Sequence, residues 1–316
     1  GAILAALAWR AKQRSNVKKI ETRIRDLGGD PGKTHIQDFI PLNELGAGGF
    51  GTVTKAVHKD HLFDDEPPCV AIKTILPARM MDIPGQTGES SYIQRFKREA
   101  RILEQLNHPN IVKLHLYDLS CPEPYIVMDY VQGQSLDKLI RKHPQGLPPE
   151  QAIKIIRPVM DAIAQCHAQK PEIVHADIKP ENIMVTSAGT PMLMDFGIAN
   201  KHGEARITKS SEFVGSTGYA APEATRGEKG PSVDQYAIGA LLFEMLTGER
   251  ANQEDNAIQE LMNAQLGRVR MLSEVKPQWG SFAKAIDKMR AFNVADRYSS
   301  VEEALQVLRT LKPPAR

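Results

Sequence analysis

The stretch HADIKPENIMV, residues 175–185, is the most informative part of the sequence. Its aspartate, Asp177, follows Ala176 at a place where a very common sequence pattern has an arginine. This raises a question, because Asp177 could be a working catalytic base or the missing guanidinium could mark a site that has lost its chemistry. Composition, domain organisation and the motifs on either side decide between the two interpretations.

The composition is that of a globular chain without a strongly charged partner. The 316 residues are 41% hydrophobic, enough to bury a sizeable core. Forty Lys and Arg against 38 Asp and Glu give a net charge of +2, so nucleic acid is not expected as a partner. The cysteines Cys69, Cys121 and Cys166 lie far apart without CxxC or Cys/His ligand spacing, which argues against disulfides or zinc and favours a reducing, cytoplasmic setting.

Residues 1–33 form a basic leader. Residues 1–9, GAILAALAW, are apolar, and Lys and Arg cluster between residues 10 and 25. Nine apolar residues cannot cross a bilayer, which takes about 20, but the end of a longer span followed by basic residues would look the same. Two expectations therefore stay open: a helical leader, or a juxtamembrane segment tethered to a membrane upstream of residue 1, with the rest of the chain facing the cytoplasm.

Residues 34–131 are predicted to form a small antiparallel sheet with one helix. Five strand-length runs of β-branched and apolar residues follow a turn-rich stretch; they are residues 39–46, 51–59, 69–76, 111–119 and 124–131. Residues 90–106 carry apolar side chains at helical spacing, which predicts a helix. Residues 61–68 and 77–91 are typical of surface loops.

Residues 132–316 are predicted to be mostly helical. Five segments have the pattern of amphipathic or buried helices; they are residues 135–142, 151–170, 233–248, 282–292 and 301–311. A β-rich first part joined by a short segment to a helical second part predicts an α+β fold of two lobes with a cleft between them.

The segment LGAGGFGTV, residues 45–53, places glycines at positions 46, 48 and 51. Glycine lets the backbone approach phosphate oxygens, but GxGxxG also occurs in dinucleotide-binding folds and in ordinary turns. Here the motif lies between two predicted strands rather than at the start of a helix, which disfavours dinucleotide binding. The chain also has no GxxxxGK[ST] phosphate loop.

The segment CVAIK, residues 69–73, is a strand-length run that ends in Lys73. A lysine flanked by apolar residues needs a counter-ion, and Glu99 in the predicted helix is the candidate. A lysine held in such a pair can bind nucleotide phosphates as a positioned charge. The alternative for both residues is an ordinary charge that faces solvent.

Six motifs occur in a fixed order along the chain. They are GAGGFG before Val53, VAIK, Glu99 in a helix followed by NHPNIV, HADIKPEN, DFG at residues 195–197 and APE at residues 221–223. Their order and spacing over residues 35–311 resemble those of eukaryotic-like Ser/Thr protein kinases. The resemblance implies the two-lobed kinase fold, with residues 34–131 as N-lobe and 132–316 as C-lobe. It also implies an enzyme that transfers the γ-phosphate of ATP to protein Ser and Thr hydroxyls, itself included through self-association.

The resemblance implies a role for each catalytic residue. Asp177 would accept the proton of the substrate hydroxyl, and Lys179 would offset charge on the transferred phosphoryl group. Thr217 would contact the catalytic aspartate. Lys73 and Glu99 would position the phosphates.

The metal and nucleotide ligands follow in the same way. Asn182 and Asp195 would bind Mg²⁺ or Mn²⁺, because both offer hard oxygen ligands. The residues expected around ATP are Leu45, Gly46, Gly48, Gly51, Val53, Ala71, Lys73, the gatekeeper Met128, the hinge residues Asp129, Tyr130 and Val131, and Met184. For the apolar members the alternative is plain core packing.

Other positions are expected to be structural. His175 would pack and form hydrogen bonds within its loop without a catalytic role. Glu223 would pair with Arg297 as a buried ion pair. Asp234 would brace the catalytic loop from a buried helix.

Ala176 is the main departure from the family pattern. In many relatives the arginine at this place binds a phosphate on the activation segment and orders that segment. Alanine cannot do so, although Thr208, Ser210 and Ser211 remain as acceptors. The substitution therefore predicts a reduced dependence on activation-segment phosphorylation rather than lost chemistry.

Two other functions are compatible with parts of the pattern. A pseudokinase would use the fold to bind nucleotide or to scaffold, but such proteins typically lose the equivalents of Lys73, Asp177 or Asp195. A small-molecule phosphotransferase of the aminoglycoside or choline kinase type also has a small residue before the aspartate. Enzymes of that type do not carry a lysine equivalent to Lys179 of KPEN or a segment like GSTGYAAPE, residues 215–223. Both are present in this chain, so a protein substrate is expected.

Overall fold

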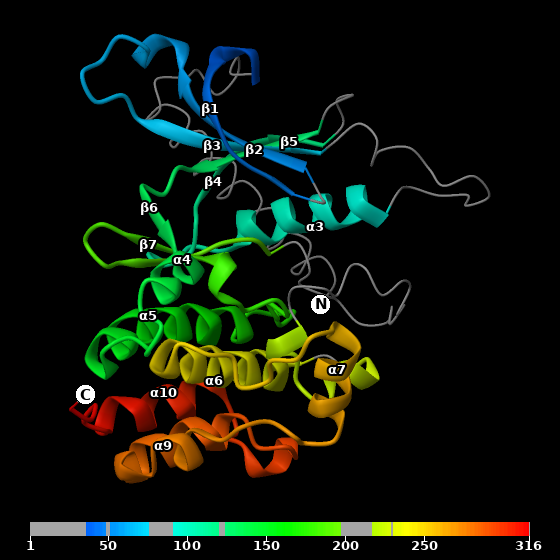
Figure 1. Ribbon diagram of the computed structural model, residues 1–316. Coiled ribbons are helices and arrows are strands. Elements are labelled where there is room, and N and C mark those ends of the chain that lie inside the picture. Colours follow the sequence, from blue (N-terminus) through cyan, green and yellow to red (C-terminus); the bar gives the residue numbers. More distant parts are fainter. Residues whose placement is uncertain are drawn as a thin grey trace, which may run out of the picture. The chain divides into compact units, whose positions relative to one another are not determined.

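The structure, a computed structural model, describes residues 36–48, 51–75, 91–119, 124–196, 217–228 and 230–315. The chain divides into two compact units (Figure 1). The first comprises residues up to Asn107 and Val112–Val131, and the second comprises His108–Ile111 and Gln132–Arg316. The predicted leader and all but the last residue of the predicted loop 77–91 lie outside the described residues. Among the described helices, none combines the length and apolar character needed to span a membrane.

The first unit is built on a five-stranded antiparallel sheet (Figure 1). Its strands are β1 (Phe39–Gly48), β2 (Gly51–His58), β3 (Cys69–Ile75), β4 (Leu114–Asp118) and β5 (Tyr125–Asp129), in the order β1-β2-β3-β5-β4. Short 3₁₀ turns lie at Ile36–Asp38 (η1) and Lys59–His61 (η2). The β-branched and aromatic residues of these runs favour extended backbone, and all five predicted strands form.

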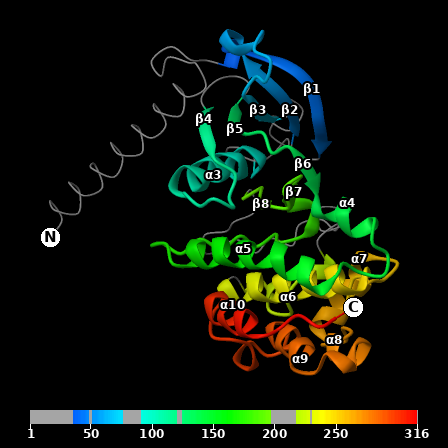
Figure 2. The same ribbon diagram turned by 90° about the vertical axis from the view of Figure 1, so that its left-hand side faces the viewer.

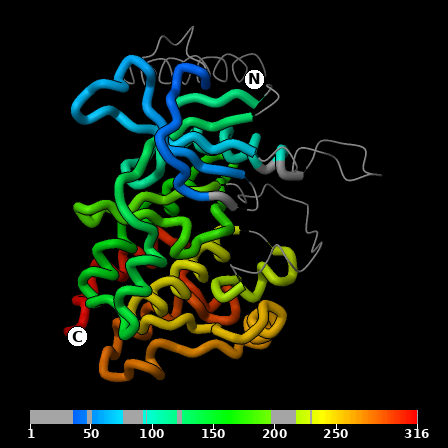
Figure 3. Tube along the Cα trace, turned by 45° about the horizontal axis from the view of Figure 1, so that its top comes forward, coloured from blue at the N-terminus to red at the C-terminus, as the bar shows by residue number. Residues whose placement is uncertain are grey.

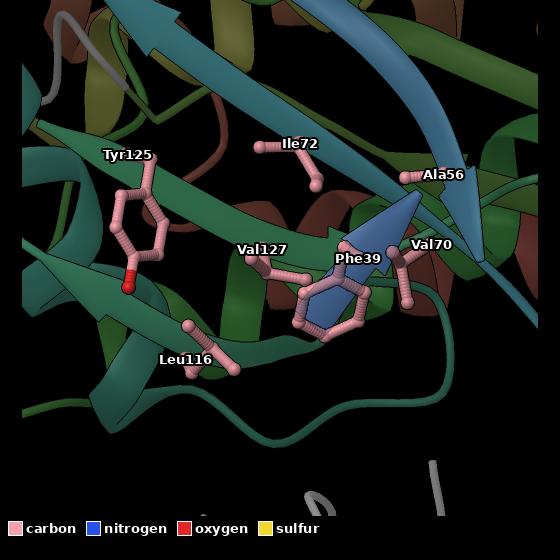
Figure 4. Packing of buried hydrophobic residues seen from close by; sticks show 7 residues of the cluster. All are labelled: Phe39, Ala56, Val70, Ile72, Leu116, Tyr125 and Val127. Carbon is pink, nitrogen blue, oxygen red and sulfur yellow. The ribbon is translucent and has the colours of Figure 1, made fainter. Parts of the chain in front are cut away.

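One face of this sheet carries an apolar core (Figure 4). Along β3 the side chains alternate, so that Val70 and Ile72 enter the core while Ala71 and Lys73 point to the opposite face. The cluster consists of Phe39, Ala56, Val70, Ile72, Leu116, Tyr125 and Val127. Burial of each large side chain contributes roughly 1.5–3 kcal/mol. The alternation therefore stabilises the sheet on one face and leaves Lys73 available on the other.

The helix α3 (Ser91–Gln105) packs against β3 and β4 (Figure 2). Phe96, Ala100 and Leu103 recur at helical spacing and are buried, whereas Arg101 is exposed. The helix predicted over residues 90–106 is therefore confirmed. Its buried side also carries one carboxylate, that of Glu99.

The second unit is mainly helical. Its helices are α4 (Leu136–Arg141), α5 (Pro149–His167), α6 (Pro231–Thr247), α7 (Ala257–Gln265), α8 (Leu272–Val275), α9 (Gly280–Met289) and α10 (Val301–Thr310). Short 3₁₀ turns lie at Pro180–Asn182 (η3), Thr217–Tyr219 (η4), Ala224–Arg226 (η5), Pro277–Trp279 (η6) and Val294–Asp296 (η7). Helix α6 contacts α5, α9 and α10 (Figure 1, Figure 3), and nearly all of its side chains are buried, as a helix enclosed by others requires.

A small antiparallel sheet accompanies these helices. Its strands β6 (Gly133–Ser135), β7 (Ile183–Thr186) and β8 (Pro191–Leu193) lie in the order β6-β7-β8. The sequence did not predict them, because three or four residues are too short to show a period. Strand β7 directly follows η3, so this sheet fixes the end of the stretch HADIKPENIMV.

Glu223 and Arg297 form a buried ion pair in the second unit, as predicted. Arg297 Nη1 lies 2.6 Å from Glu223 Oε1, and Nη2 lies 2.8 Å from Oε2. Ser232 Oγ donates a further bond to Glu223 Oε1 at 2.9 Å. Burial alone would raise the pKa of Glu223, but the hydrogen bonds and charge of Arg297, together with bonds from the backbone and from Ser232, outweigh burial and hold this pKa below its usual value.

Replacing Arg297 by methionine should destabilise the second unit, because the Glu223 carboxylate is then buried without its cation. We expect Arg297→Met to lower the free energy of unfolding by about 3–5 kcal/mol in urea denaturation at neutral pH. Since folding lowers the pKa of Glu223, the contribution of the pair is present above the usual glutamate pKa. It is lost as the pH falls through the lowered folded value, so the effect of the substitution should shrink in acid.

Arg309→Met is the matched control for this prediction. It removes a surface pair in which Arg309 Nη2 lies 3.4 Å from Asp161 Oδ1 and both side chains are about half exposed. We expect a loss below ~1 kcal/mol for this variant. Equal losses in the two variants would contradict a stabilising role for the buried pair.

Candidate active site

The first unit carries a salt bridge between Lys73 and Glu99. Lys73 Nζ lies 2.8 Å from Glu99 Oε1 and 2.7 Å from Oε2. The side chain of Glu99 is 3% exposed and that of Lys73 is 13% exposed, so charge-assisted bonds in poorly solvated surroundings fix the ammonium group. The expected pairing thus forms between β3 and α3.

The hairpin between β1 and β2 carries the glycine-rich motif. Gly46 pairs with Val53 and Gly48 pairs with Gly51, while residues 49 and 50 lie outside the described residues. A Cβ at Gly51 would lie 1.8 Å from Thr74 O, so packing requires glycine there. A Cβ at Gly46 would meet nothing within 4 Å, so this glycine borders open space.

The apolar residues expected around an adenine ring differ in their surroundings. Ala71 on β3 and Met128 on β5 are paired neighbours, and both are buried. Leu45 on β1 is exposed, and Val53 on β2 and Met184 on β7 are half-buried. Ala71 and Met128 therefore belong to the packed part of the sheet, whereas the other three retain surface that a ligand can cover.

The expected hinge begins at Asp129, where β5 ends. Asp129 Oδ1 lies 2.7 Å from His115 Nε2 on β4, and Oδ2 accepts a bond from the backbone N–H of Lys113 at 3.4 Å. Burial alone would raise the pKa of Asp129, but the bonds from His115 and Lys113 lower it. The Lys55 ammonium lies 4.5 Å from the centre of the Tyr130 ring. Both side chains thus contact other residues of the first unit.

Two residues of HADIKPENIMV converge on the carboxylate of a third in the second unit. Lys179 Nζ lies 2.7 Å from Asp177 Oδ2, and Asn182 Nδ2 donates to the same oxygen at 2.9 Å and to the backbone carbonyl of Asp177 at 2.8 Å. Asp177 is 9% exposed. The carboxylate is therefore held in one orientation by a cation and an amide, which is what a catalytic base requires.

Asp234 on α6 braces this loop, as predicted. Its carboxylate accepts bonds from the backbone N–H groups of His175 at 2.9 Å and Ala176 at 2.8 Å, and it lies 2.8 Å from His167 Nε2. Ala176 adopts φ 60°, a left-handed conformation that costs energy for a residue with a Cβ. The two bonds from Asp234 hold the backbone in this conformation.

His175 connects the catalytic loop to the segment before Asp195. Its Nδ1 accepts a bond from the Asp177 backbone N–H at 3.3 Å, so Nε2 carries the proton and donates to Met194 O at 3.0 Å. Its ring packs against Phe196 with the ring centres 4.7 Å apart. The structural role expected for His175 is therefore confirmed.

Asn182 and Asp195 are the candidate metal ligands. Because Asn182 Nδ2 is used on Asp177, the carbonyl oxygen Oδ1 is the atom that can bind a cation. The described part of the chain contains no group of three or more His, Cys, Asp or Glu side chains arranged for a metal ion. Two oxygen ligands nevertheless fit Mg²⁺, which is usually bound by one or two protein groups, with phosphates and waters completing its shell.

Thr217 differs from expectation. Its hydroxyl donates a hydrogen bond to Glu260 Oε2 on α7. A threonine hydroxyl has one proton, so Thr217 does not donate to Asp177 in this structure. Glu260 could not be recognised as this partner from the sequence, because a single glutamate in a helix is usually exposed.

His115 and His167 were also missed as partners of functional residues. His115 is buried on β4 beside Asp129, and His167 ends α5 beside Asp234. Each is a lone histidine in its segment, and no spacing along the sequence links it to its carboxylate. Only the pairing of β4 with β5, and the packing of α5 on α6, brings the groups together.

Comparison with known proteins agrees with this geometry. The protein kinase domain family matches residues 39–309. The chain is 34% identical over 275 residues to the serine/threonine-protein kinase PrkC of Bacillus subtilis, covering 85% of this chain and 40% of that protein. It is 31% identical over 281 residues to the probable serine/threonine-protein kinase PknB of Lactococcus lactis, covering 88% and 43%.

A third relative is the serine/threonine-protein kinase PknL of Mycobacterium tuberculosis, 32% identical over 278 residues, covering 85% of this chain and 65% of that protein. The chain thus spans 40% to 65% of the length of these relatives. The matched residues include both units and every motif from the glycine-rich hairpin to APE. The chain therefore belongs to the protein kinase family, within its eukaryotic-like Ser/Thr branch.

Proposed function

We propose that this chain transfers the γ-phosphate of ATP to Ser and Thr hydroxyls of proteins, its own copies included, with Mg²⁺ as the metal. The observation that carries the proposal is the Asp177 carboxylate, held between Lys179 and Asn182 on a loop braced by Asp234. Family membership supports ATP and a divalent metal in general. Asn182 and Asp195 would hold Mg²⁺, which offsets the charge of the phosphates when bound.

Phosphoryl transfer needs positioning and charge rather than covalent help from the protein. Asp177 accepts the proton of the acceptor hydroxyl, and Lys179 offsets negative charge on the group in transfer. Lys73, fixed by Glu99, binds nucleotide phosphates as a point charge. Thr217 contacts the catalytic aspartate in the reacting state. A pseudokinase typically lacks the equivalents of Lys73, Asp177 or Asp195, and all three residues are present here.

We further propose that activity depends little on phosphorylation of the activation segment. Ala176 offers a methyl group where many relatives offer a phosphate-binding guanidinium. The loop around it is instead fixed by Asp234, which bonds the backbone N–H of both His175 and Ala176 and in turn contacts His167. The described residues of this brace lie outside the activation segment, which supports a catalytic loop that is ordered without a phosphate.

Removing the Asp177 carboxylate should abolish phosphate transfer. We expect Asp177→Asn to lower kcat by about 10²–10⁴-fold, the range for loss of a general base, and Asp195→Ala to abolish Mg²⁺-dependent turnover. Transfer from labelled ATP to a mixture of Ser- and Thr-containing peptides measures both. Asp161→Asn, which changes a half-exposed carboxylate, is the matched control and should act like the wild type. Equal transfer by all four proteins would show that the assignment is wrong.

The activation segment provides a second test. The triple variant Thr208→Ala, Ser210→Ala, Ser211→Ala should retain turnover, because residue 176 is not an arginine that could bind a phosphate on this segment. Ala176→Arg should show greater activation by phosphorylation of the segment than the wild type. Both are measured on dephosphorylated protein by initial rates. Loss of turnover in the triple variant, with Asp177→Asn as the inactive reference, would contradict the proposed regulation.

A further inference from the structure

Helix α7 holds the segment Thr217–Tyr219 through a buried polar contact. Thr217 is 1% exposed and Glu260 is 4% exposed, and the Thr217 hydroxyl donates to Glu260 Oε2. The other carboxylate oxygen, Oε1, lies 3.1 Å from Arg250 Nη1. One buried carboxylate therefore joins the hydroxyl to a cation on the segment that follows α6.

The surroundings keep this carboxylate in place. Asn252 Nδ2 donates to the backbone carbonyl of Glu260 at 2.7 Å. Gly218 packs against Arg250 so closely that a Cβ at residue 218 would lie 2.9 Å from Nη1. Helix α7 and η4 are therefore in direct contact (Figure 1), and the neighbouring groups fix Glu260 at the position from which it bonds Thr217.

The Thr217 hydroxyl has a single proton to donate. In this structure Glu260 receives it, while Asp177 Oδ2 is occupied by Lys179 and Asn182. We propose that Glu260 is a positioning residue that holds Thr217 in a resting state, and that turnover is accelerated, though not made possible, when the hydroxyl transfers its bond from Glu260 to Asp177. This inference rests on the proposed function, in which Thr217 contacts the catalytic aspartate.

The strength of the restraint follows from charge. A hydrogen bond to an ionised carboxylate is roughly twice as strong as one to a neutral amide. Glu260→Gln keeps the size of the side chain and its acceptor oxygen but removes the charge. It should therefore weaken the hydrogen bond from Thr217 without leaving a cavity. Arg250 is partly exposed, and water can solvate it in this variant.

The experiment uses the full chain with a mixture of Ser- and Thr-containing peptides and Mg²⁺-ATP. We expect Glu260→Gln to raise kcat by about threefold to tenfold, the change that corresponds to a weaker hydrogen bond, while KM for ATP stays constant. In a Thr217→Val background the same substitution should not change kcat, because the hydroxyl is absent. Glu254→Gln is the matched control, since this carboxylate accepts a bond from Asn263 rather than from Thr217.

A value of kcat that stays equal or falls in Glu260→Gln would overturn the proposal, and so would a rise that persists with Thr217→Val. Unfolding free energies of the wild type, both single variants and the double variant test the contact independently of activity. If the loss of unfolding free energy in the double variant differs from the sum of the two single losses, the two residues are coupled and the bond between Thr217 and Glu260 is supported. If the losses simply add, the proposal is overturned. Failure of the proposed function would be distinguishable, because the wild type would then transfer no more phosphate than Asp177→Asn.

Discussion

The second unit depends on the burial of one carboxylate side chain, Asp234, in a mostly apolar helix. The side chain of Asp234 is fully inaccessible, and a buried carboxylate is costly unless donors surround it. Here two backbone N–H groups and an imidazole surround it, and two of these three donors belong to the catalytic loop. Burial of the Asp234 carboxylate thus requires these donors, and the two bonds from the backbone N–H groups of His175 and Ala176 fix the loop.

The same helix secures the rest of the unit. Ser232 and Gln235 flank Asp234 along the first turns of α6. Ser232 donates to Glu223, and Gln235 exchanges two bonds with the backbone of Tyr298 at 3.0 and 3.2 Å. Helix α6 thus holds the catalytic loop, the APE segment and the residues around Tyr298 from neighbouring positions. Because its interior face is apolar, these few polar contacts define which loop lies where.

The sequence predicted the elements whose buried faces are apolar. Strand β3 is a strand-length run of apolar and β-branched residues, and helix α3 carries buried apolar residues three to four positions apart, so both were recognisable. Helix α7 does not bury an apolar face in this way. Its Ile258 and Met262, and Leu266 directly after it, are exposed, whereas Glu260 and Asn263 are buried. Its pattern gives no sign of which side faces the core. The partner of Thr217 was therefore not predictable, since it lies on the helix that the sequence did not reveal.

The candidate site likewise has a part that the sequence predicts and a part that only the fold shows. Asp177, Lys179 and Asn182 lie within six residues, so one tight loop brings them together and a motif in the sequence suffices to predict them. Their supports come from other elements, and only the packed fold joins them. Ala176 shows why both levels matter. Its side chain alone suggests a site that has lost its chemistry. Its backbone, however, adopts a left-handed conformation and donates a hydrogen bond to Asp234, which holds the neighbouring Asp177 in place. The backbone of this loop is thus held by a carboxylate from the core of the second unit.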